Sequence, residues 1–152
     1  MKRVLLIVAC VSLPLAMTGC DVLNYIWQHI QGHSYPQVDL SALENVAGSI
    51  SSATIDRGNL PINTVVGYKT RSGFYGKLAI SSTPGATLKI QFTTYKTDGT
   101  VLASSPALSV GPNAYCDLEA GAVVSGASVS DFLWRSDGVL VPQGPAAFYL
   151  FP

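Results

Sequence analysis

The clearest regularity in the chain is an alternation of apolar and polar residues between positions 88 and 95. An alternation with a period of two is typical of a β-strand that buries one face and leaves the other in water. The segment therefore predicts a strand with a buried side formed by Leu88, Ile90, Phe92 and Thr94, and a wet side formed by Lys89, Gln91, Thr93 and Tyr95.

Short β-type segments separated by turn residues fill most of the chain beyond position 53. Turns such as Thr97-Asp98-Gly99 and Ser136-Asp137-Gly138 favour tight hairpins. No helical pattern separates the strands, which disfavours an all-parallel sheet. We therefore predict an all-β fold, an antiparallel β-sandwich or small barrel. Its other strands are expected at 64–70, 75–81, 101–110 with a break at Pro106, 115–119, 131–135, 139–141 and 146–151.

A helical pattern comes before the β region. Val22, Ile26 and Ile30 share one face between residues 21 and 31, which predicts a short amphipathic helix. Two interpretations stay open for it: the helix lies in a membrane interface, or it packs on the domain's own core. The segment 32–38 is expected to be a linker.

The segment 41–52 stays open between helix and strand. Ser41 and Glu44 have the spacing of a capping box, which favours the start of a helix. Gly48 and the serine- and threonine-rich stretch after it suit a strand or a loop equally well.

The first twenty residues form a third pattern. Lys2 and Arg3 precede an apolar run from Val4 to Leu15, which is the layout of a secretory signal and is too short to span a bilayer comfortably. The residues Met17-Thr18-Gly19-Cys20 then resemble the lipobox of bacterial lipoproteins. The resemblance implies cleavage before Cys20, acylation of Cys20, and attachment to a membrane through the acyl chains.

The resemblance also implies a plan for the whole chain. We expect a signal peptide at 1–19, a lipid-anchored tether at 20–38 with the short amphipathic helix, and a β-sandwich domain at 39–152. Asp21 resembles the signal that retains enteric lipoproteins in the inner membrane. The expected location is therefore the cell envelope, with the periplasmic face of the inner membrane favoured over the outer membrane or the cell surface.

Cysteine usage agrees with this plan. Cys10 would leave with the leader and Cys20 would carry lipid, so Cys116 would be the single cysteine of the folded domain. No internal disulfide is then available. We expect Cys116 to be a small buried hydrophobic residue, because no histidine or cation adjoins it in the sequence to activate the thiol.

Charge excludes one class of partner. Residues 20–152 carry seven basic and nine acidic side chains, and only 12% of the full chain is charged. Proteins that bind nucleic acid need clustered cations, so nucleic acid is not an expected partner.

Histidine-dependent chemistry is also disfavoured. His29 and His33 both fall in the predicted tether, so the β domain lacks the base of Ser-His-Asp or Cys-His catalysis and the usual ligands of catalytic zinc. We expect no enzyme activity, no cofactor and no metal. The alternative is a small polysaccharide-acting hydrolase with a carboxylate pair drawn from Asp117, Glu119 and Asp131.

One cluster suggests a ligand site. Lys69, Arg71, Tyr75 and Lys77 place cations and an aromatic ring around a predicted turn, a combination that binds anionic or sugar ligands. The competing interpretation is a hairpin with a solvated basic face. Trp134 is expected in the core.

These features predict a membrane-anchored lipoprotein whose β-sandwich is a binding module in the cell envelope. Its partner would be an envelope protein or a glycan. Besides the hydrolase, a surface-exposed lipoprotein that meets a host is a further alternative.

Overall fold

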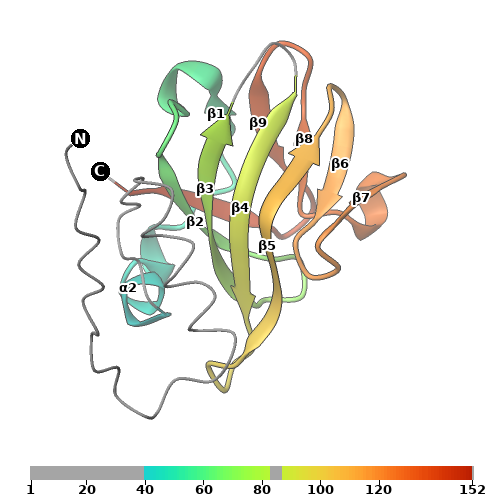
Figure 1. Ribbon diagram of the computed structural model, residues 1–152. Helices are drawn as coiled ribbons and strands as arrows, with labels where there is room; N and C mark the ends of the chain where they lie inside the picture. The colour runs from blue at the N-terminus through green and yellow to red at the C-terminus, as the bar shows by residue number, and fades with distance from the viewer. Residues whose placement is uncertain (1–39, 83–86, 152) are drawn as a thin grey trace, which may run out of the picture. The chain divides into compact units, whose positions relative to one another are not determined.

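The computed structural model describes residues 40–82 and 87–151 (Figure 1), which belong to one compact unit, Tyr35–Pro152. They form two five-stranded antiparallel sheets, so the predicted antiparallel β-sandwich is confirmed. The leader, Cys20 and the expected helix at 21–31 lie outside the described residues.

Each sheet combines neighbouring hairpins with one strand from a distant part of the chain. In sheet A the order is β10-β2-β3-β4-β5, and in sheet B it is β1-β9-β8-β6-β7. The strands of sheet A are β2 (Val65–Lys69), β3 (Tyr75–Ser82), β4 (Leu88–Tyr95), β5 (Val101–Val110) and β10 (Ala147–Leu150). Those of sheet B are β1 (Ile55–Asp56), β6 (Ala114–Asp117), β7 (Ala122–Val124), β8 (Phe132–Trp134) and β9 (Val139–Pro142).

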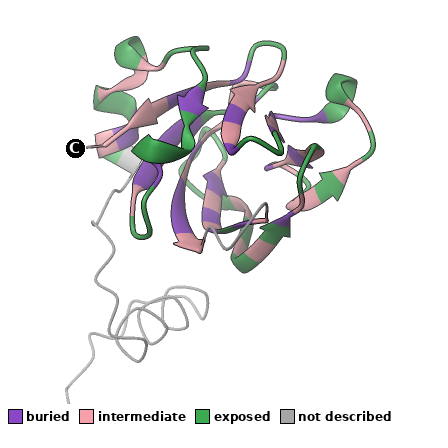
Figure 2. Ribbon diagram, turned by 90° about the horizontal axis from the view of Figure 1, so that it is seen from above, coloured by how far each residue is buried: buried purple, intermediate pink, exposed green. Residues whose placement is uncertain are grey.

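The core lies between the sheets, where the buried segments gather (Figure 2). The alternation predicted for β4 is confirmed, because Leu88, Ile90, Phe92 and Thr94 are all buried. Phe132 of sheet B meets Phe148 of sheet A edge to face, with ring centroids 6.1 Å apart. Trp134 is fully buried, as expected.

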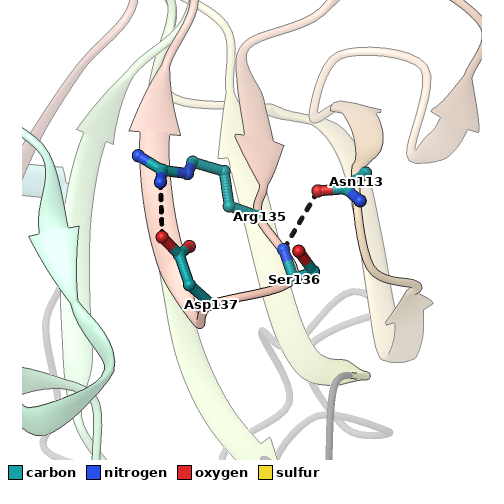
Figure 3. A network of polar contacts seen from close by, with 4 residues as sticks. All are labelled: Asn113, Arg135, Ser136 and Asp137. Atoms are coloured by element: carbon teal, nitrogen blue, oxygen red, sulfur yellow. Dashed lines mark hydrogen bonds and ion pairs between the residues drawn. The ribbon is translucent and has the colours of Figure 1, made fainter.

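Three hairpins share one turn geometry. In each, the N–H of a glycine donates to the carbonyl three residues earlier at 3.0 Å, and the glycine has a φ between 82° and 94°. A left-handed φ is costly for residues with a Cβ, so the glycines at 73, 99 and 138 define where these turns close. In the 135–138 turn, Arg135 also pairs with Asp137, and the Ser136 N–H donates to Asn113 Oδ1 at 3.0 Å (Figure 3).

The segment 41–52, for which the sequence left helix and strand as alternatives, contains both a helix and an extended residue. Helix α2 spans Leu40–Asn45, and Ser51 then pairs with Phe148 through backbone hydrogen bonds of 2.8 and 2.9 Å. Leu43 of α2 is fully buried against Val65 and Ala79 on the outer face of sheet A. The 3-10 helices are η1 (Ala47–Ser49), η2 (Arg57–Asn59) and η3 (Ala127–Val129).

Two strand predictions were wrong in detail. The strand expected at 115–119 ends at Asp117, because Asp117 Oδ1 accepts the N–H groups of Glu119 and Ala120 at 2.8 and 2.9 Å and turns the chain. The break expected at Pro106 is absent from β5. An irregular register opposite β4 accommodates the proline at this sheet edge, and Ser105 Oγ accepts the N–H of Ala107 at 3.3 Å.

Candidate ligand-binding face of sheet A

Charge is divided between the two sheets. The four lysines of the described residues, at 69, 77, 89 and 96, lie on sheet A or at the start of its β4–β5 turn. Five of the seven described carboxylates belong to sheet B and its loops: Asp56, Asp117, Glu119, Asp131 and Asp137. Sheet A therefore presents the more basic surface.

A row of facing residues crosses the outer face of sheet A. Lys69 of β2 pairs with Tyr75 of β3, and Tyr75 pairs with Tyr95 of β4. Their neighbours Tyr68, Gly76 and Thr94 are buried, and alternation along the strands therefore places the row on the opposite, outward side. Cross-strand partners have Cβ atoms about 5 Å apart, so the two tyrosines are direct neighbours.

A cavity of about 120 Å³ opens beside the two tyrosines. Three segments that are distant in sequence line it, namely α2, the start of β3 and the β4–β5 turn. The two tyrosines are half-buried, whereas Glu44 and Lys96 are exposed. The lining consists of Glu44, Phe74, Tyr75, Tyr95, Lys96 and Thr97.

The structure brings together three of the four residues that the sequence indicated as a ligand site. Lys69, Tyr75 and Lys77 lie on the outer face of sheet A, where Lys77 occupies the next outward position of β3. Arg71 extends away from them, because its Nη1 donates to the carbonyl of Ala127 at 3.3 Å. Ligand binding by these residues stays a prediction.

Sequence reasoning missed Glu44, Lys96 and Thr97, and it did not connect Tyr95 with Tyr75. The alternation of β4 already placed Tyr95 on the wet side, which was a usable signal. Its pairing with Tyr75 depends on the register between β3 and β4, and the position of Glu44 depends on α2 packing across the sheet.

The carboxylates considered for hydrolysis all bind backbone groups. Asp131 is buried and accepts the Arg71 N–H at Oδ1 and the Leu118 N–H at Oδ2, both at 2.7 Å. Glu119 accepts the Ser72 N–H at 3.1 Å. Burial raises the pKa of Asp131, although its two backbone hydrogen bonds act in the opposite direction. These contacts join the β2–β3 turn to sheet B; the hydrolase alternative itself stays a prediction.

A series of side-chain hydrogen bonds also crosses the core beside Asp131. The hydroxyls of Tyr68 and Thr94 are 2.7 Å apart, and Thr94 Oγ1 donates to the carbonyl of Leu118 at 2.6 Å. Burial raises the pKa of Tyr68, so its hydroxyl stays protonated. Within residues 40–82 and 87–151, every buried side-chain nitrogen or oxygen has a hydrogen-bond partner.

Cys116 is fully buried in the core, as the sequence predicted. Burial raises the pKa of its thiol strongly, and the nearby carboxylates of Asp131 and Asp117 act in the same direction. A protonated, enclosed thiol is a poor nucleophile, so Cys116 behaves as a packing residue.

Comparison with known proteins identifies no relative from which the chemistry of the site could be inferred. No protein-family model, no curated protein and no solved structure matches the chain. In the described part of the chain, no helix has the length and apolar character needed to cross a membrane. The same residues contain no group of three or more potential metal ligands.

Proposed function

We propose that this protein is a lipoprotein of the bacterial cell envelope, anchored through acyl chains on Cys20, whose β-sandwich works by binding rather than by catalysis. The observation that carries the proposal is the lipobox-like Met17-Thr18-Gly19-Cys20 directly after a signal-type leader. One acyl chain gives marginal membrane binding, whereas several give stable anchoring. Asp21 supports a location at the periplasmic face of the inner membrane.

The β-sandwich supports a role in binding through its outer surface. Its acidic side chains Asp117, Glu119 and Asp131 serve the backbone of the fold. The outer face of sheet A, in contrast, gathers lysines, tyrosines and a cavity. Cations beside aromatic rings suit a glycan or an acidic segment of an envelope protein.

Acylation is tested by metabolic labelling with an alkyne-bearing fatty acid in a bacterial host. We expect the wild-type protein to carry the label in the membrane fraction and Cys20→Ser to lose it completely. Cys10→Ser is the matched control, because it removes a cysteine from the same leader and should leave labelling unchanged. Full labelling of Cys20→Ser would contradict the anchor.

Binding is tested by pull-down from detergent-solubilised envelope through a C-terminal tag. We expect a protein or glycan to be enriched with the wild type and reduced with the double variant Lys96→Ala, Thr97→Ala. Both side chains are exposed, so the variant should keep its fold. Recovery of the tagged protein alone would argue against a binding module.

A further inference from the structure

We infer that the cavity between α2, β3 and the β4–β5 turn is a binding site for a single pyranose ring of an envelope glycan. The inference rests on the proposed binding role and adds a place and a ligand class to it. Three properties of the cavity carry the argument: its aromatic wall, its polar rim and its size.

The aromatic wall supplies the stacking surface. Tyr75 and Tyr95 are paired across β3 and β4 on the outward side of the sheet, and Phe74, which directly precedes β3, lines the same cavity. A pyranose ring has one face formed by C–H groups, which packs favourably on the flat face of an aromatic side chain. The tyrosines are also held in place, because both pack against the cluster around Leu43, Val65 and Ala79.

The polar rim supplies hydrogen bonds of both kinds. Glu44 can accept from sugar hydroxyls, Lys96 can donate to them, and Thr97 can do either. Among the described residues, no ion pair joins Glu44 to Lys96, although both line the cavity. Hydroxyls, which donate and accept at once, match a rim that presents a carboxylate and an ammonium around one opening.

The size of the cavity suits one sugar ring. Its volume of about 120 Å³ lies below the roughly 300–1,000 Å³ of sites that enclose a drug-sized molecule. Its outer side is formed by the exposed Glu44, Lys96 and Thr97, so neighbouring sugars of a longer chain can remain in solvent. The site therefore suits a residue within a glycan or at its end.

The test is saturation-transfer NMR on the mature, detergent-solubilised protein. The probes are chitotetraose and cellotetraose, and mannitol is the control ligand because it has hydroxyls but no ring face. We expect transfer to ring C–H protons of at least one tetrasaccharide and none to mannitol. No transfer to either tetrasaccharide at millimolar concentration, or equal transfer to mannitol, would overturn the inference.

Point variants test whether the sugar binds in this cavity. Tyr95→Leu keeps an apolar side chain but removes the ring, and we expect affinity to fall about 3- to 10-fold. Lys96→Ala should also weaken binding, whereas Lys89→Ala, an exposed lysine near the other end of β4, should not. Unchanged affinity in Tyr95→Leu would overturn the inference.

The experiments distinguish failure of the pyranose site from failure of the proposed function. Labelling at Cys20 together with recovery of an envelope protein, but no sugar binding, would retain the lipoprotein binding module and reject the pyranose site.

Discussion

The two sheets bury their inner faces in the same way but use their outer faces differently. On sheet A, Leu43 and Phe151 pack over the outward residues Val65 and Ala79, which become buried. On sheet B the corresponding cross-strand row stays half exposed along its whole length. That row consists of Val124, Tyr115, Leu133 and Val141.

The difference shows how one short helix changes the role of a sheet face. Where α2 packs on sheet A, the face becomes a second, small core. The cavity lies at the margin of this cover, where Glu44 of α2 approaches the outward tyrosines of β3 and β4. On sheet B, the apolar row of the outer face instead stays partly exposed.

Removal of the last strand should have the largest effect. Deletion of residues 146–152 removes Phe148, which packs on Phe132 and Tyr68 between the sheets, and Phe151, which covers sheet A. Replacing one buried Phe by Ala already costs about 3–5 kcal/mol, so the truncated protein should fail to fold. Circular dichroism with thermal unfolding measures this, and wild-type stability would show that the strand assignment is wrong.

A matched pair of leucine variants tests the contrast between the outer faces directly. Leu43→Ala should lower the free energy of unfolding by about 2–5 kcal/mol, because this side chain of α2 is fully buried against sheet A. Leu133→Ala should cost about 1 kcal/mol or less, since its side chain is half exposed on sheet B. Urea unfolding of both variants measures the difference, and equal losses would contradict a covered sheet A and an open sheet B.

The contact between the β2–β3 turn and sheet B gives a smaller effect. In Asp131→Asn the amide nitrogen replaces one acceptor, so either Arg71 N–H or Leu118 N–H loses its partner. We expect a loss of about 1–3 kcal/mol in the free energy of unfolding. Asp137→Asn, at a half-exposed ion pair, is the control and should cost less than about 1 kcal/mol.

The difference in stability between the wild type and Asp131→Asn should also depend on pH. Because the pKa of Asp131 is raised in the folded state, this carboxyl binds more protons in the folded than in the unfolded protein between the two pKa values. Its contribution to stability is therefore present below the unfolded pKa and is lost as pH rises through the folded pKa. The difference in stability between wild type and Asp131→Asn should shrink as pH rises through this range. A difference that grows with pH would contradict a raised pKa.

Local patterns were sufficient for much of the fold. The alternation at 88–95 identified the inner face of β4, and the glycines at 99 and 138 marked two hairpins, because both signals depend on a few adjacent residues. The end of β6 was missed because the Asp117 side chain captures two backbone N–H groups, an outcome that periodicity does not encode.

The candidate site was harder to predict, because its parts meet only through long-range packing. Tyr75 and Lys69 stood out as neighbours of a turn, but of these two only Tyr75 lines the cavity, and Glu44 reaches it from a helix some thirty residues earlier. Arg71 was grouped with them because it is close to them in sequence. Its contact with Ala127 of η3, 56 residues later, could not be predicted from sequence spacing.

The pairing of β10 with β2 also has a consequence for the order of folding. The hairpins from β2 to β5 join neighbours in sequence, so their loops close at low entropic cost. Strand β10 follows almost at the end of the chain, and it pairs with residues about eighty positions earlier. During synthesis, β2 would therefore wait with an unpaired edge, a template for wrong pairing with another chain. We expect aggregation to compete with folding mainly in that interval, before the last strand arrives.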